Sequence, residues 1–152
     1  MKKICFVAST GGHWEEIRCL GEVAEGNDCF YVTEEGGQVE ETDLSPLYLF
    51  PKINRKEKGF LSHFIKLAAE SRKIIKKEQP DVVISTGALL SFPFCLWAKL
   101  MGKKVIYIES FARVHSPSLT GKLVYKFADL FIVQWESMLE FYPNAVYTGG
   151  IF

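Results

Sequence analysis

The residues best suited to chemistry form a small polar run near the start of the chain. An apolar run, Lys3–Val7, precedes it, and a helix-like pattern begins at Trp14. A tight turn between a strand and a helix directs free backbone N–H groups into one cleft, where the positive end of the helix dipole also favours an anion. This arrangement predicts a phosphate-binding turn. Its residues are Ser9, Thr10, Gly11, Gly12 and, at its edge, His13.

His13 adds to this turn a side chain that can take up or release a proton near neutral pH. A simpler interpretation is that Gly11 and Gly12 only allow the first strand and the first helix to pack closely. The run also lacks the spacing of the G-x-G-x-x-G fingerprint, which argues against a dinucleotide site.

Apolar strand patterns and helical patterns alternate along the whole chain. Val82–Ser85 is a continuous apolar run, as expected of a parallel strand covered on both faces. Strands are predicted at 3–7, 28–33, 47–50, 82–85, 104–108, 130–133 and 145–148. Helices are predicted at 14–24, 61–78, 89–101, 119–127 and 136–142, with an acidic loop at 34–43. This alternation predicts an α/β fold, a mostly parallel sheet with helices on both faces.

Three loops rich in Gly, Ser and Thr follow strands of this predicted sheet. They are Ser9–His13, Ser85–Ser91 and Glu109–Thr120. Ligands of such sheets bind where the carboxyl ends of the strands meet, so we expect the three loops to converge on one site. Gly87 belongs to the second loop, although glycine after a strand is also ordinary turn chemistry.

Length and composition limit the classes of protein and of partner. The chain has 152 residues, 48% of them hydrophobic, which predicts one domain, 1–152, with a real core. The net charge is zero, so we expect no nucleic-acid partner. The four cysteines have no metal-binding spacing, which predicts reduced thiols of a cytosolic protein and no metal. The first apolar run is too short for a signal peptide, and the longest, Ala88–Met101, is too short to span a bilayer.

Charge is distributed unevenly along the chain. Glu15–Asp43 holds ten acidic residues and one basic residue, whereas Lys52–Lys77 holds nine basic residues and two acidic ones. Apolar side chains flanked by lysines are typical of a helix that lies on anionic lipid, and we predict peripheral membrane contact here. The predicted membrane residues are Lys56, Lys58, Phe60, Leu61 and Phe64. The alternatives are a solvated helix face and burial of Phe64 in the core.

Several short motifs occur in an order that resembles a known family. They are Ser9–His13, Ser85–Gly87, Glu109–Val114, Leu119–Lys122, Ala128–Asp129 and Val133–Trp135. The set resembles the acceptor-side subunit of the two-component N-acetylglucosaminyltransferase of dolichol-linked oligosaccharide synthesis. It resembles still more the bacterial relatives of that subunit in capsule and exopolysaccharide synthesis. More distantly, it is similar to the amino-terminal half of the transferase that adds GlcNAc to the lipid-linked peptidoglycan precursor.

The resemblance implies a split glycosyltransferase of the GT-B class. This chain would be its Rossmann-like, membrane-facing half and would bind a polyprenyl-diphosphate-linked sugar. A separate subunit would bind the UDP-sugar, and no further cofactor is expected. The implied location is the cytoplasm, at the inner face of the cell membrane. The eukaryotic subunit has an amino-terminal membrane anchor, which we do not find in this sequence.

The resemblance also implies roles for individual residues. The glycine-rich motif falls on Gly11, Gly12 and His13, and His13 would act as general base or orient the acceptor hydroxyl. The second loop of the family falls on Glu109, Ser110 and Arg113. Arg113 would hold the diphosphate, and Glu109 is the alternative base.

Two other functions remain open at this stage. The chain could be a non-catalytic recruiter that docks and activates its partner on the membrane, and substitution of His13 separates this from catalysis. It could also be a free-standing nucleotide-binding module of flavodoxin-like type, which the isolated chain would reveal by binding a nucleotide.

Overall fold

The fold is a seven-stranded parallel sheet, described by a computed structural model that covers residues 1–36, 44 and 46–152. The strand order is β3-β2-β1-β4-β5-β6-β7, and every neighbouring pair is parallel. The strands are β1 Lys3–Ala8, β2 Asp28–Glu34, β3 Leu47–Phe50, β4 Val82–Gly87, β5 Lys104–Ile108, β6 Leu130–Val133 and β7 Val146–Tyr147. The helices are α1 Gly12–Arg18, α2 Gly21–Ala24, α3 Phe60–Glu78, α4 Ser91–Leu100, α5 Leu119–Tyr125 and the 3-10 helix η2 Glu136–Glu140. The predicted fold class is thus confirmed.

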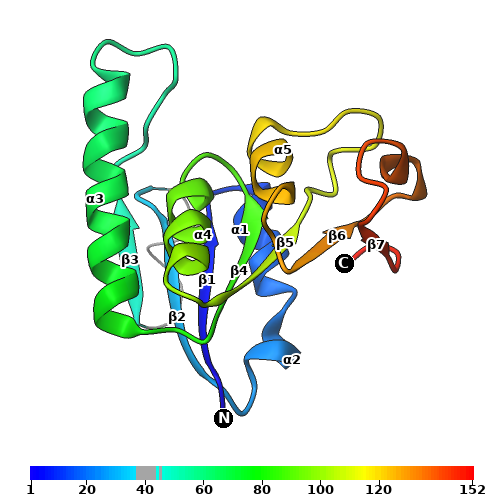
Figure 1. The fold of residues 1–152 in the computed structure, drawn as a ribbon, viewed down its shortest axis with the longest axis horizontal. Helices are drawn as coiled ribbons and strands as arrows, with labels where there is room; N and C mark the ends of the chain where they lie inside the picture. The colour runs from blue at the N-terminus through cyan, green and yellow to red at the C-terminus, as the bar shows by residue number, and fades with distance from the viewer. Residues whose placement is uncertain (37–43, 45) are drawn as a thin grey trace.

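Helices cover both faces of the sheet (Figure 1). α1 covers one face with Trp14 and Ile17, which belong to a core cluster with alternate residues of β1. α3, α4 and α5 cover the other face, where the larger cluster includes Leu67, Phe94 and Val124. β1 lies in the middle of the sheet and contributes to both clusters, which is why nearly all of its side chains are apolar.

The structure corrects some of the predicted boundaries. The helix predicted at 14–24 is two short helices, because the chain leaves helical geometry at Leu20 and starts again at Gly21. Glycine loses more backbone entropy in a helix than other residues and so favours such a break. The helix predicted at 136–142 is a 3-10 helix, and the last strand pairs over two residues only, as the edge of the sheet. In the predicted acidic loop, Glu34 belongs to β2, and 37–43 lies outside the described residues.

α3 connects two parallel strands, β3 and β4, and therefore runs antiparallel to them. Leu67, Ile74 and Ile75 are buried at helical spacing, and Gln79 ends the helix in the left-handed conformation just before a proline. Because of its direction, α3 begins at the end of the sheet where the strands have their carboxyl ends (Figure 1). None of the described helices is long and apolar enough to cross a membrane.

Candidate active site

A cavity of about 310 Å³ lies at the carboxyl ends of the strands. The predicted convergence of three loops is confirmed, since residues of all three line it. The lining residues are His13, Arg55, Ala88, Leu89, Ser110, Ala112, Arg113, Ser118, Leu119 and Thr120. Among the residues that the structure describes, no cluster of His, Cys, Asp or Glu could hold a metal ion.

His13 is fixed at this cavity by two hydrogen bonds to one residue of β4. Its Nδ1 lies 2.9 Å from the carbonyl oxygen of Thr86, and the Thr86 hydroxyl donates to the His13 carbonyl oxygen at 2.6 Å. A carbonyl oxygen can only accept, so Nδ1 carries the proton in this hydrogen bond. The other ring nitrogen, Nε2, is then an acceptor. The side chain is 31% exposed, and a ring in this tautomer can act as a base.

Gly87 lies directly behind the His13 ring. Its φ is 125°, and a Cβ there would lie 3.0 Å from both Cε1 and Nδ1 of His13. Ala88, which follows it and lines the cavity, also has a positive φ, of 75°. A positive φ is unusual in a residue other than glycine and is most often found at functional sites. Because Gly87 has no Cβ, the His13 ring has the space to pack against its backbone.

Glu109 is 1% exposed and does not line the cavity. Its carboxylate accepts hydrogen bonds from the backbone N–H of Ser110 and Ser118, from the Ser118 hydroxyl at 2.7 Å and from the Tyr142 hydroxyl at 2.6 Å. Burial raises the pKa of Tyr142, and its hydrogen bond to Glu109 adds to the rise. Gly121 completes the enclosure, since a Cβ there would lie 2.2 Å from a Glu109 oxygen. Glu109 therefore ties the cavity loop to the start of α5.

Two arginines line the cavity. Arg113 comes from the predicted second loop, whereas Arg55 comes from the segment between β3 and α3. Sequence reasoning did not select Arg55, although it lies in the basic block at 52–77. Two guanidinium groups beside one cavity suit a diphosphate, because each presents paired N–H donors.

Most of the remaining residues predicted to bind phosphate do not line the cavity. Ser110 does, but Ser9, Thr10, Gly11 and Gly12 do not. Gly11 has a φ of 80°, and its carbonyl oxygen accepts the N–H groups of the residues at 14 and 15. The glycine-rich run therefore starts α1 and brings His13 to the cavity.

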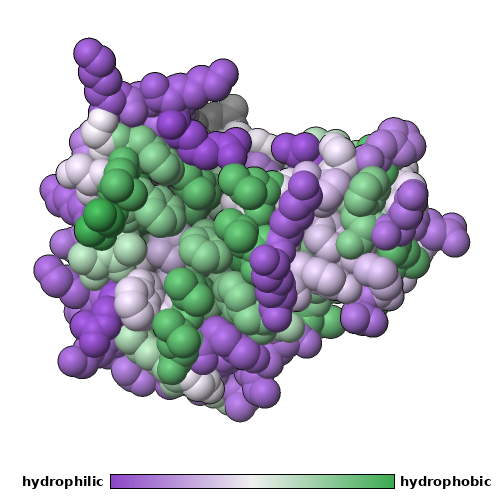
Figure 2. Space-filling model, turned by 45° about the horizontal axis from the view of Figure 1, so that its top comes forward, coloured by the Kyte–Doolittle hydropathy of each residue, from purple (hydrophilic) through white to green (hydrophobic). Residues whose placement is uncertain are grey.

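The predicted membrane residues lie at the N-terminal end of α3 and in the segment before it. Leu61 is 69% exposed and Ile65 is 60% exposed, whereas Phe60 and Phe64 are half-buried and stack on each other at 5.8 Å. Phe64 also packs against the core. Lys56 and Lys58 are exposed. Figure 2 shows hydrophobic side chains gathered in a broad patch on the face that α3 and α4 present, with hydrophilic side chains around it.

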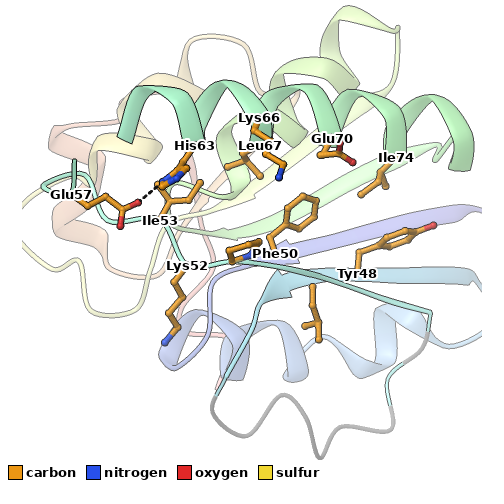
Figure 3. Close-up of a pocket in the computed structure, with 12 residues that line it drawn as sticks. Tyr48, Phe50, Lys52, Ile53, Glu57, His63, Lys66, Leu67, Glu70 and Ile74 are labelled. Carbon is orange, nitrogen blue, oxygen red and sulfur yellow. Dashed lines mark hydrogen bonds and ion pairs between the residues drawn. The ribbon is translucent and has the colours of Figure 1, made fainter. Parts of the chain in front are cut away.

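A second cavity, of about 560 Å³, lies between α3 and β3 (Figure 3). Its apolar part includes Phe50, Ile53 and Leu67, and its charged residues carry both signs. His63 Nδ1 and Glu57 Oε1, 2.9 Å apart, form a hydrogen bond within it. None of the predicted catalytic or phosphate-binding residues lines this cavity.

Comparison with known proteins connects this site to a family. The family model described as "Oligosaccharide biosynthesis protein Alg14 like" matches residues 4–151. The rat and human proteins named UDP-N-acetylglucosamine transferase subunit ALG14 are each 29% identical over 177 residues, covering 97% of this chain and 82% of theirs. The pyrophosphoryl-undecaprenol N-acetylglucosamine transferase of Staphylococcus carnosus is 28% identical over 158 residues, covering 95% of this chain and 43% of that enzyme.

Solved structures agree with this relationship at the level of the fold. Acinetobacter baumannii MurG superposes with a TM-score of 0.75 at 17% identity, over 90% of this chain and 43% of that one. Staphylococcus aureus MnaA, solved with UDP, superposes with a TM-score of 0.74 at 17% identity, over 99% of this chain and 46% of that one. The fold is that of the N-terminal half of GT-B enzymes such as MurG. With a family model that spans residues 4–151, the chain belongs to the Alg14-like family of oligosaccharide biosynthesis proteins.

Proposed function

We propose that this chain is the acceptor-binding subunit of a split GT-B glycosyltransferase. It binds a polyprenyl-diphosphate-linked sugar and, with a separate donor-binding subunit, transfers a hexose from a UDP-sugar in the synthesis of a polysaccharide such as a capsule or exopolysaccharide. The observation that carries the proposal is a cavity that joins a histidine, protonated at Nδ1, to two arginines. The names of the relatives, which contain the words "transferase subunit", support a partner chain.

In the proposed reaction His13 is the general base. Its Nε2 takes the proton of the acceptor hydroxyl while the hydroxyl oxygen forms a bond to C1 of the donor sugar, and the bond from C1 to UDP breaks. Arg55 and Arg113 bind the diphosphate of the acceptor. Glu109, the alternative base, is buried among four donors, so the geometry favours a role in holding Ser110 and the cavity loop.

The subunit is proposed to work as a peripheral protein at the cytoplasmic, inner face of the cell membrane. Lys56, Lys58 and Arg55 lie in the segment that leads into α3, and the first turns of α3 carry the exposed side chains of Leu61 and Ile65. This segment is at the same end of the sheet as the cavity, and Arg55 lines the cavity itself. A bilayer at this surface would present the diphosphate of a lipid-linked acceptor close to both arginines.

Substitution of His13 tests the catalytic part of the proposal. We expect His13→Ala to lower the rate of transfer by the assembled enzyme by about 10²-fold or more, the scale for loss of a general base. His115→Ala is the matched control, because His115 is exposed on the same loop as Arg113 and does not line the cavity. Circular dichroism and co-purification with the partner report whether fold and assembly survive.

The opposite result would support a different function. If His13→Ala turns over like the wild type, the chain supplies no base and acts as a recruiter that activates its partner. If the isolated chain binds a nucleotide tightly without any partner, a free-standing nucleotide-binding module is favoured instead.

A further inference from the structure

Glu16 is a buried carboxylate next to the candidate base. It is 2% exposed and lies on α1, one turn after His13. Its Oε1 accepts the backbone N–H of Phe111 at 2.6 Å and the side-chain amide of Gln134 at 3.3 Å. Its Oε2 has no hydrogen-bond partner among the described residues. A buried oxygen without a donor is costly, so its position calls for a functional reason.

Two segments outside α1 hold the Glu16 carboxylate in place. Phe111 belongs to the loop after β5, and Gln134 follows β6. The Gln134 amide also donates to the carbonyl oxygen of Glu109 at 3.0 Å, and its Oε1 accepts the N–H of Ile151 at 3.1 Å. The Phe111 N–H and the Gln134 amide are the two donors to Glu16. The Glu16 side chain cannot rotate toward solvent without losing both of these hydrogen bonds.

The free oxygen faces His13. Glu16 Oε2 lies 3.9 Å from His13 Nδ1, too far for a hydrogen bond, and that nitrogen already donates to Thr86. The interaction is therefore one of charge and not of hydrogen bonding. An opposite charge at this distance favours the charged form of its neighbour.

Other charged groups also surround this pair. Glu109 is a second carboxylate that acts on Glu16, and Glu34 at the end of β2 acts on His13. Burial raises the pKa of Glu16, while the hydrogen bond from Phe111 and the charge of His13 oppose the rise. Arg55 and Arg113 line the cavity on which His13 lies, so a third positive charge there needs compensation.

We propose that Glu16 is the positioning residue that enables His13 to act as a base. Its carboxylate compensates the positive charge that the imidazole gains when Nε2 takes the proton of the acceptor hydroxyl. This inference rests on the proposed role of His13. The residues from which it is argued all belong to this chain, so it can be measured in the isolated chain.

The first test follows the ionisation of His13 by NMR in the isolated chain. We expect Glu16→Gln to lower the pH midpoint of the His13 titration by about one unit, equal to tenfold weaker proton binding. Glutamine keeps an oxygen for the Phe111 N–H, so the fold should survive, which a thermal melt checks. Glu15→Gln is the matched control, because Glu15 is the neighbour on the same helix with a side chain 47% exposed. An unchanged midpoint in Glu16→Gln overturns the inference.

The second test needs no change at Glu16 and so does not depend on how that variant folds. Coupling between two sites is reciprocal. In His13→Gln the carboxyl carbon of Glu16 should therefore titrate at a higher pH than in the wild type, because the favourable imidazolium charge is gone. A Glu16 titration that is the same in both proteins overturns the inference by this independent route.

The assembled enzyme links the coupling to catalysis. In the pH profile of kcat/KM, Glu16→Gln should move the acid limb to lower pH and lower the plateau, since a weaker base accepts the proton less readily. A lower plateau with an unmoved acid limb contradicts the inference and indicates a merely structural residue. If His13→Ala keeps full turnover, the proposed function fails, while the coupling found by NMR stands.

Discussion

At the scale of single residues, the free space around a few side chains decides what the site can do. The His13 ring lies against Gly87 and the Glu109 carboxylate against Gly121, and a methyl group at either glycine would enter that space. Glycine is needed at these two positions for close approach, and at Gly87 also for its positive φ. Alanine substitutions therefore test each of these two arrangements separately.

Gly87→Ala should displace the His13 ring and reduce transfer by the assembled enzyme at least tenfold. The backbone at φ 125° adds strain of about 1–3 kcal/mol. Gly102→Ala is the control, because Gly102 also has a positive φ, 77°, but its Cβ would meet no atom within 4 Å. That variant should melt at a lower temperature and keep its rate per folded molecule. Equal rates in the two variants would mean that the ring is not held by this contact.

Gly121→Ala should lower the free energy of unfolding by about 1–3 kcal/mol, the usual cost of overpacking a rigid interior. The new Cβ would lie 2.7 Å from the Tyr142 hydroxyl oxygen, as well as against Glu109. Gly21→Ala, also in a helix but with no atom within 4 Å of its Cβ, should change stability by no more than about 1 kcal/mol. Urea denaturation of both variants measures the difference, and equal stabilities would show that the Glu109 cluster can relax.

At the scale of elements, α3 has two distinct faces. Leu67 and Ile74 are buried and, with Glu70, line the cavity beside β3, whereas Leu61 and Ile65 are exposed. The exposed pair belongs to α3, and Figure 2 shows a broad hydrophobic patch on the face that α3 and α4 present. Exposed apolar side chains of this kind, with lysines nearby, are expected to enter the interface of an anionic bilayer.

Leu61→Ser with Ile65→Ser should remove the salt-resistant part of binding to anionic vesicles. Each large apolar side chain that enters the interface contributes roughly 1.5 kcal/mol. Each lysine near the surface adds about 1 kcal/mol, which salt screens. Lys56→Ala with Lys58→Ala should therefore lose binding mainly at low salt. Vesicle sedimentation at two salt concentrations measures both.

Thermal melting provides the control for this experiment. The Leu61 and Ile65 substitutions should leave the melting temperature nearly unchanged, because both side chains are exposed. Phe60→Ser with Phe64→Ser should lower it, because these rings stack on each other and Phe64 packs against the core. If the first variant binds vesicles in high salt like the wild type, this face of α3 is not the membrane surface.

At the scale of the whole molecule, the described residues form one parallel sheet with its helices. The cavity at its carboxyl end holds the groups proposed to bind an acceptor. GT-B enzymes such as MurG, whose first half has this fold, are more than twice as long as the matched region, since this chain covers 43% of MurG. In the proposed split enzyme, the donor-binding function belongs to a second chain.

We expect the purified chain to show no transfer from a UDP-sugar to a lipid-linked acceptor, and to gain activity when a donor-binding partner is added. The partner alone is the control and should also be inactive. A radiolabelled-sugar transfer assay with each chain and with the mixture measures this. Robust transfer by the single chain would contradict a split enzyme.

The sequence by itself determined the sheet, the order of helices and strands, and the end of the sheet at which ligands bind. These features follow from the local periodicity of apolar residues. Examples are the apolar run at the start of β4 and the 3.6-residue repeat of α3. It also determined that His13 ends a glycine-rich turn. The helix break at Gly21 and the short β7 were missed because both depend on small local energies.

Only the tertiary structure decided which polar residues meet at the site. Arg55 joins Arg113 at the cavity although two strands, two helices and their loops separate them, and Glu109 turns inward to hold its own loop. Glu15 and Glu16 are adjacent and chemically identical, yet one is 47% exposed and the other 2%. One step along a helix turns a side chain by about 100°, and the partners of Glu16, at positions 111 and 134, come from distant parts of the chain. Burial of that kind is fixed by packing between elements, which local sequence does not encode.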